Sequence, residues 1–178
     1  DDNMAHIATY STALAVAMDI ARLSGASLYA MGRVRIAALR ETPKWPGGVA
    51  TKLATIRLCL AQEARIVAAM TFRSRDDADT VAKAMNTAFE DAAVAAADDL
   101  DAGTYSAIVA THSIVVKFLA DQGRLKPRVV NYAMAEPMPS LRISQRLYGT
   151  GGRGEEIAQE NKVVHPAFCP KEGRALAL

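Results

Sequence analysis

The sequence predicts a mainly α-helical protein, with an antiparallel helical bundle over residues 1–122 and a small α+β unit over residues 123–178. Three features change near Gly123 and support this division. Before it, apolar residues recur at steps of three, four and seven, which is the spacing of one face of a helix. After it lie five of the seven prolines, and prolines break helices and stiffen loops. The charge also changes, from 12 basic and 14 acidic residues (net −2) to 9 basic and 5 acidic residues (net +4).

The overall composition excludes several classes of protein. With 178 residues, 51% hydrophobic and 22% charged, the chain is neither disordered nor collagen-like. A net charge of +2 is too small for a protein whose main task is to coat nucleic-acid phosphates. The two cysteines, Cys59 and Cys169, lie far apart and outside any zinc-binding pattern. Charges interrupt every apolar stretch, so we expect no signal peptide and no membrane-spanning helix. Asp1 and Asp2 are interpreted as the start of a fragment of a longer protein.

The first part is expected to hold two helices before residue 72. Apolar residues from Ile7 to Leu39 fit one long helix or two stacked pieces, with Gly25 and Gly32 as weak points. The run from Pro43 to Gly48 stops any helix, and a second helix is predicted over residues 49–71.

Two further helices complete the predicted bundle. Ser74 to Asp77 resembles a capping box, which predicts the start of a third helix. The acidic run up to Gly103 ends that helix, Thr104 is expected to cap a fourth, and Gly123 to stop it. Many alanines allow the helix axes to approach closely, as in a bundle. A solenoid of helical repeats would show a constant repeat length of 34 to 45 residues, and the sequence has none.

Residue types that carry chemistry are scattered. The histidines His6, His112 and His165 have no spacing that would form a triad or a metal site. The acidic groups at residues 76–79 and 98–101 lack the glycine and final glutamate of a calcium loop, so they are interpreted as caps and turns.

The glycine-rich run at residues 149–154 lacks the Lys and Ser/Thr that end a phosphate-binding loop and follows no hydrophobic strand. We therefore predict no catalytic residue, no metal, no cofactor and no enzyme activity.

The last third shows a different order of elements. A strand is predicted over residues 128–134, followed by a helix over residues 141–148 that Gly149 stops. A second short helix is predicted over residues 155–161, closed by Asn161 in the left-handed conformation. A proline loop and a final strand over residues 174–178 complete the order strand, helix, helix, strand.

This order and several short motifs resemble a LysM-like module. The motifs are Arg146-Leu147-Tyr148-Gly149, Glu156-Ile157-Ala158, Asn161, His165-Pro166, Phe168-Cys169-Pro170 and Gly173-Arg174-Ala175-Leu176. The segment is also similar to the C-terminal end of the DNA circularisation protein family of Mu-like phages, a tail and baseplate component in which an Ala-rich helical region precedes such a segment. The resemblance covers residues 128–178 by motif, and residues 1–122 by composition alone.

The resemblance implies a structural, non-catalytic phage or prophage protein in the virion tail, assembled in the bacterial cytoplasm. Its partners would be other tail or baseplate proteins, and identical subunits are expected to form a ring. Two alternatives stay open: a LysM-type peptidoglycan-binding module, and a DNA-end-binding or circularisation protein that the near-neutral charge does not favour. Glycan-binding modules usually offer a polar turn after the first strand, where this chain has residues 135–140, Ala-Glu-Pro-Met-Pro-Ser.

A candidate docking surface follows from these motifs. Leu147 and Ile157 are expected in the core, with the Tyr148 hydroxyl near the rim. The docking residues predicted for a protein partner are Arg142, Arg146, Tyr148, Arg153, Asn161 and His165.

Overall fold

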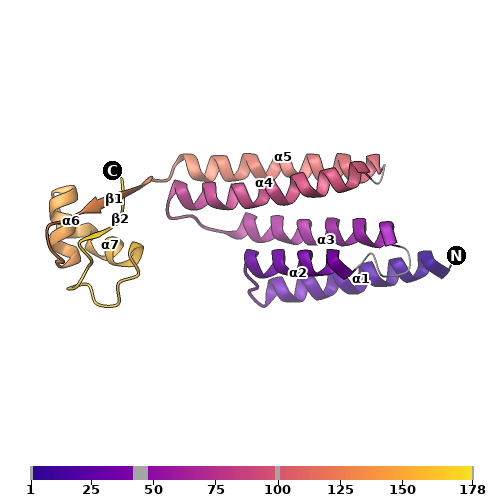
Figure 1. The fold of residues 1–178 in the computed structure, drawn as a ribbon, viewed down its shortest axis with the longest axis horizontal. Helices are drawn as coiled ribbons and strands as arrows, with labels where there is room; N and C mark the ends of the chain where they lie inside the picture. Colours follow the sequence, from indigo (N-terminus) through magenta and orange to yellow (C-terminus); the bar gives the residue numbers. More distant parts are fainter. Residues whose placement is uncertain (1, 42–47, 99–100, 178) are drawn as a thin grey trace. The chain divides into compact units, whose positions relative to one another are not determined.

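The computed structural model describes residues 2–41, 48–98 and 101–177 (Figure 1). Within these ranges the chain forms seven α-helices and one two-stranded antiparallel sheet, and 72% of it is helical. The prediction of a mainly α-helical fold is therefore confirmed. Five long helices precede the sheet: α1 (Asp2–Leu23), α2 (Leu28–Glu41), α3 (Gly48–Ala69), α4 (Arg75–Asp98) and α5 (Ala102–Arg124).

The chain divides into two compact units. One comprises Asp1–Thr71 and Val81–Ala120, and the other comprises Phe72–Thr80 and Asp121–Leu178. We call them the helical unit and the C-terminal unit. The sequence division near Gly123 left residues 72–80 in the bundle, whereas their contacts group them with the C-terminal unit.

Within residues 2–41 the helix is interrupted at Gly25. Gly32 does not interrupt it, because it lies inside α2. Gly25 has a φ of 87°, a left-handed conformation that favours glycine. The Ser27 hydroxyl then accepts a hydrogen bond from the Ala30 amide at 3.2 Å and caps the start of α2. The alternative of two helical pieces is thus the one that the structure shows. The predicted stop over residues 43–48 lies, apart from Gly48, outside the described residues.

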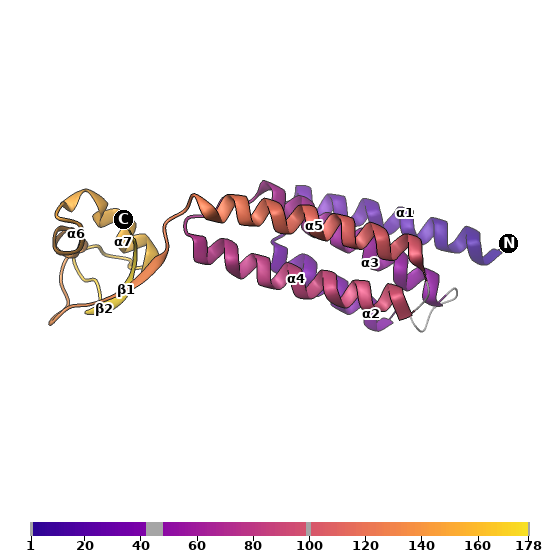
Figure 2. The same ribbon diagram turned by 90° about the horizontal axis from the view of Figure 1, so that it is seen from above.

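Both α1 and α2 pack along α3 (Figures 1 and 2). Met18, Met31 and Cys59 form a buried cluster among these three helices. A polar layer lies beside it, since Arg35 of α2 approaches Glu63 of α3 at 2.9 Å and both side chains are largely buried. Glu63 is therefore held by tertiary contacts that helical periodicity does not reveal.

The predicted capping box at the start of α4 is confirmed. The Ser74 hydroxyl accepts from the Asp77 amide at 3.1 Å, and an Asp77 carboxylate oxygen accepts from the Ser74 amide at 3.2 Å. The prediction for α5 is wrong in its cap, because that helix begins at Ala102 and the Asp101 carboxylate accepts from the Thr104 amide at 2.9 Å. Asp101 therefore has the capping role predicted for Thr104. The helix also runs one residue past Gly123, to Arg124.

Helices α3, α4 and α5 are joined by side-chain contacts within the helical unit. Arg57 of α3 donates to Asp101 at 3.2 Å and also to the Thr104 hydroxyl. His112 of α5 contacts the Asn86 amide oxygen of α4 at 2.8 Å and stacks on Phe89.

Helix α5 is long and apolar enough to cross a membrane by length and composition, although no such helix was expected. One helix of this kind is weak evidence for a membrane span, because core helices meet the same criteria.

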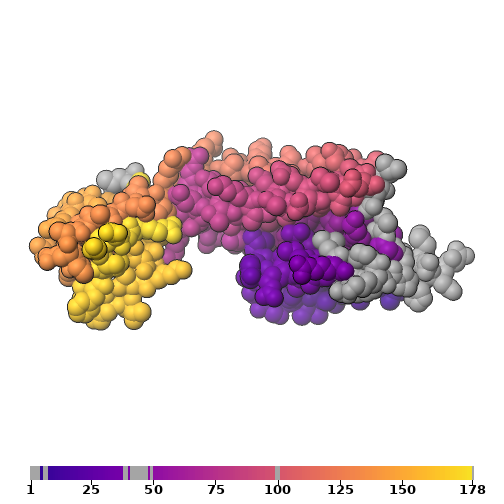
Figure 3. Space-filling view, in the orientation of Figure 1, coloured from indigo at the N-terminus to yellow at the C-terminus, as the bar shows by residue number. Residues whose placement is uncertain are grey.

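The C-terminal unit has the order strand, helix, helix, strand. Its elements are β1 (Val129–Ala133), α6 (Ser140–Tyr148), the 3₁₀ turn η2 (Gly151–Arg153), α7 (Gly154–Glu160) and β2 (Glu172–Leu176). The strands pair antiparallel, with Val129 opposite Leu176 and Ala133 opposite Glu172. The final strand thus begins two residues before the predicted one. In the space-filling view, these elements are the orange to yellow atoms (Figure 3).

One small core holds these elements together. Its buried members are Tyr132, Met138, Ile143, Ile157, Cys169 and Ala175, and Leu147 packs against them. Gly154 permits the close approach of α7 to α6, because a Cβ there would lie 3.1 Å from the Leu141 backbone. The predicted core positions of Leu147 and Ile157 are confirmed.

Candidate functional site

The predicted docking residues occupy two kinds of environment. Arg142 and Arg146 lie four residues apart on α6, so their side chains project from neighbouring positions on one helix face. Both residues are exposed, and neither has an ion pair within the described part of the chain. The neighbouring Leu141 side chain is also exposed, at 63%. This α6 surface therefore offers two unpaired positive charges beside an apolar side chain.

Tyr148 and Arg153 contact each other instead of projecting freely. The Arg153 guanidinium carbon lies 4.0 Å from the centre of the Tyr148 ring, and its Nη2 lies 2.8 Å from Glu156 Oε1. The Tyr148 hydroxyl donates to the Leu176 carbonyl at 2.7 Å. Burial raises the pKa of Tyr148, and the Arg153 charge opposes this shift. These contacts fix the end of α6 against β2 and the start of α7.

Asn161 binds a strand with its side-chain amide. Its Nδ2 donates to the carbonyls of Ile157 at 2.8 Å and Arg174 at 2.7 Å, and its Oδ1 accepts from the Arg174 amide at 2.7 Å. The predicted left-handed conformation is wrong for Asn161, whose φ is −95°, and Lys162 adopts it instead with a φ of 53°. The tertiary bonds to Arg174 hold Asn161 in place, so the chain turns one residue later.

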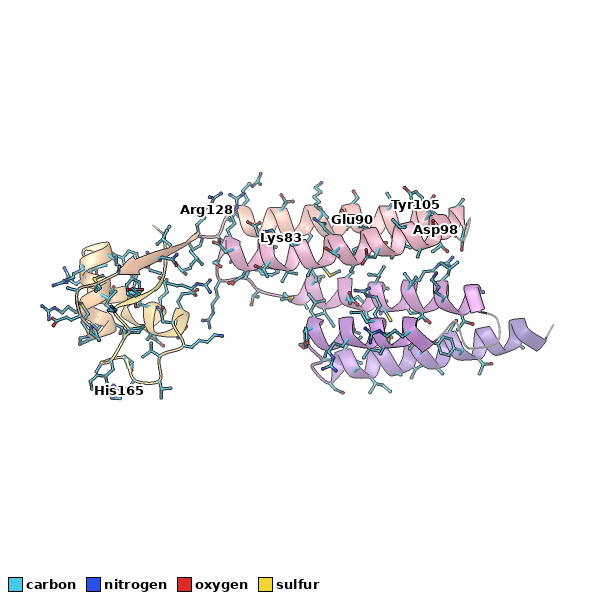
Figure 4. The ribbon with its side chains drawn as sticks, viewed as in Figure 1. Lys83, Glu90, Asp98, Tyr105, Arg128 and His165 are labelled. Atoms are coloured by element: carbon cyan, nitrogen blue, oxygen red, sulfur yellow. The ribbon has the colours of Figure 1, made fainter. Side chains whose placement is uncertain are left out.

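His165 lies in an exposed loop between α7 and β2 (Figure 4). Its Nδ1 accepts from the Ala167 amide at 3.3 Å, and its ring lies 5.4 Å from the Phe168 ring. Two backbone hydrogen bonds join this loop to the residues at the start of α6. The Cys169 amide donates to the Met138 carbonyl at 3.2 Å, and the Ser140 amide donates to the Pro166 carbonyl at 2.7 Å. The loop is thus held in a defined position, with Phe168 76% exposed.

The glycine-rich run uses its own amides internally. The Thr150 hydroxyl accepts from the Gly152 amide at 3.2 Å, and the Ser144 hydroxyl accepts from the Arg153 amide at 3.2 Å. Gly149 ends α6 with a φ of 74°. These two amides therefore stabilise the turn itself.

His112 and Cys59 of the helical unit are held in structural surroundings. His112 is held by Asn86 and Phe89, and the His6 side chain lies outside the described residues. Burial raises the pKa of the Cys59 thiol to about 12, which keeps it protonated and unreactive. No group of three or more His, Cys, Asp and Glu side chains that could hold a metal ion lies among the residues described.

Two features of the C-terminal unit were missed at the sequence level. Asp76, interpreted as a turn residue, accepts a hydrogen bond from the Val129 amide at 2.7 Å, across 53 positions in the chain. Phe168 is exposed although its aromatic side chain between prolines suggested only a rigid loop. No local sequence pattern announces either feature.

Comparison with protein-family models gives no match, and comparison with curated proteins also gives none.

Proposed function

We propose that the chain is a structural component of a phage or prophage tail or baseplate, which assembles through protein–protein contacts without catalysis. The resemblance of the C-terminal segment to the DNA circularisation family motivates the identity of the assembly. The observation that carries the docking role is the pair Arg142 and Arg146, exposed on α6 without an anionic partner in the described residues.

The physical reasoning concerns charge and burial. Exposed charges add little to the stability of a fold but steer association and set register with a partner. Leu141, 63% exposed beside them, supplies apolar area that a partner would bury. An acidic protein surface with an apolar centre fits this combination.

The experiment is an assembly assay with neighbouring tail proteins. The double variant Arg142→Glu/Arg146→Glu should weaken assembly at least tenfold while leaving the circular dichroism spectrum and the melting temperature unchanged. A matched control is Lys83→Glu/Lys117→Glu, which makes the same change of charge at exposed lysines of the helical unit (Lys83 in Figure 4). Equal assembly by both double variants would contradict the role of the α6 surface.

A second candidate is a peptidoglycan-binding module of the LysM type. The observation that favours it is the order strand, helix, helix, strand, with the loops after β1 and before β2 joined at Met138 and Cys169. Retention of the full chain on purified peptidoglycan, lost on shortening the loop around Phe168, would support it over tail assembly.

DNA binding is the third proposal. The excess of four positive charges over residues 123–178 (9 basic minus 5 acidic) supports it, and the near-neutral whole chain does not. Duplex binding that falls steeply between low and high salt would favour DNA, since each phosphate that the protein neutralises adds about one power of salt concentration to the dependence.

A further inference from the structure

The second half of helix α4 exposes one face that is both acidic and apolar. Glu90, Asp91, Val94 and Asp98 are exposed, and their spacing places them on one side of the helix (Glu90 and Asp98 in Figure 4). We call these four residues the α4 surface. The buried residues of the same stretch lie on the opposite side of the helix: Phe89, Ala92 and Ala96.

The charges of the α4 surface are not neutralised within the described part of the chain. None of its three carboxylates has an ion pair there. Between them, the Val94 side chain is 61% exposed. Lys83, two turns before Glu90 on the same face, is also exposed, so the acidic stretch ends there.

The α6 surface matches the α4 surface in charge and in spacing. Arg142 and Arg146 are one turn apart, about 6 Å along the helix axis, and Leu141 beside them is 63% exposed. Glu90 and Asp98 lie one turn on either side of Val94. Each guanidinium of the α6 surface can therefore meet a carboxylate, with exposed apolar area on both sides of the contact.

The net charges of the two parts of the chain agree with this match. Residues 1–122 have 12 basic and 14 acidic residues, whereas residues 123–178 have 9 basic and 5 acidic residues. Between two copies of the chain, α4 against α4 or α6 against α6 brings like charges together, which disfavours association. Contact of α6 with α4 brings opposite charges together. Charge complementarity thus makes a second copy a fitting partner.

We propose that the α6 surface of one copy of this chain docks on the α4 surface of a second copy. This inference rests on the proposed function for the docking role of Arg142 and Arg146, and it names the chain itself as an occupant of that site. Two copies that dock reciprocally close as a dimer, and otherwise the contact repeats head to tail into a ring or a filament. The charges set the register, while Val94 and Leu141 supply the apolar area that the contact buries.

The first test is sedimentation equilibrium of the full chain alone, from about 10 μM to about 1 mM, where weak complexes dissociate. At about 50 mM salt we expect masses above that of the monomer, and at about 0.5 M salt we expect mainly monomer, because salt screens exposed charges. A wild type that is monomeric at low salt, or that associates equally at both salt concentrations, would overturn the proposal. Neither result bears on assembly with tail proteins, so the proposed function would stand.

The second test exchanges the charges of the two surfaces. Arg142→Glu/Arg146→Glu and Glu90→Arg/Asp98→Arg should each weaken self-association at least tenfold, because like charges then face each other. An equimolar mixture of the two variants should associate again, since the acidic α6 surface of one meets the basic α4 surface of the other. This recovery would also show that both variants are folded. The matched control Glu136→Arg/Glu155→Arg makes the same change of charge at exposed carboxylates of the C-terminal unit and should associate like the wild type.

The outcomes of the exchange separate this inference from the proposed function. Self-association of either double variant as tight as that of the wild type would overturn the docking of α6 on α4. So would a mixture that stays monomeric although both variants keep the circular dichroism spectrum and melting temperature of the wild type. Recovery in the mixture, together with unchanged assembly of Arg142→Glu/Arg146→Glu with tail proteins, would support self-docking and contradict the proposed function alone.

Discussion

Replacing Asn161 by alanine tests whether a side-chain amide acts as the missing neighbour of a strand. The variant loses three hydrogen bonds of 2.7 to 2.8 Å, two of them to Arg174 of β2. A typical hydrogen bond contributes about 1 kcal/mol net, and water replaces part of this at a half-buried site. We expect Asn161→Ala to lower the free energy of unfolding of the C-terminal unit by about 2 kcal/mol.

Native-state hydrogen exchange at the β2 amides measures this effect within one unit. Ala175 is the best reporter, because its pairing with Val130 is kept in the variant. A loss of about 2 kcal/mol corresponds to roughly thirtyfold faster exchange at this amide, where opening of the whole unit controls it. The matched control is Asn131→Ala, the same chemical change at an exposed asparagine that makes no side-chain hydrogen bond in the described structure. Exchange rates within a factor of two for the two variants would refute the role assigned to Asn161.

Three further outcomes follow from burial. Gly154→Ala should cost about 1 to 3 kcal/mol in denaturant unfolding, because the added Cβ meets Leu141 atoms at 2.9 to 3.1 Å, backbone included. Burial raises the pKa of Glu63 above its usual value of 4.5. The protonated carboxyl therefore stabilises the fold below pH 4.5, and this contribution to the free energy of unfolding is lost as the pH rises through the folded-state pKa. Unfolding measured from about pH 4 to about pH 7 should show the loss, and Glu63→Gln should abolish this pH dependence. Cys59 and Cys169 should resist thiol reagents at pH 8 in the native protein and react once urea unfolds it, because both are buried with a raised pKa.

Each of these outcomes has a control. Gly152→Ala meets only the Thr150 hydroxyl, at 3.6 Å, and should be nearly neutral; equal losses for Gly152→Ala and Gly154→Ala would contradict the close approach of α7 to α6. Glu90→Gln removes an exposed carboxylate (Figure 4) and should leave the pH dependence as in the wild type. Rapid labelling of native protein would show that the thiols are accessible.

Features set by neighbouring residues could be predicted from the sequence. The capping box at Ser74 and Asp77 spans four residues and was confirmed, because both partners lie within one turn. The helix stop at Gly149 was confirmed for the same reason. The strand, helix, helix, strand order followed from periodicity and from the placement of prolines.

Features set by distant residues could not be predicted. The bonds of Asn161 to Arg174 cross 13 positions, and that of Asp76 to Val129 crosses 53. Local rules therefore assigned Asn161 to a left-handed helix end and Asp76 to a turn. At α5 two residues competed for one cap, and spacing alone did not show that Asp101 would take it from Thr104.

The contacts also separate the predicted docking residues by what a mutation would report. Tyr148, Arg153 and Asn161 bind other parts of their own unit, so replacing them changes stability together with any docking. Arg142 and Arg146 project from α6 without ion pairs in the described residues, so charge reversal there probes a partner and leaves the fold intact.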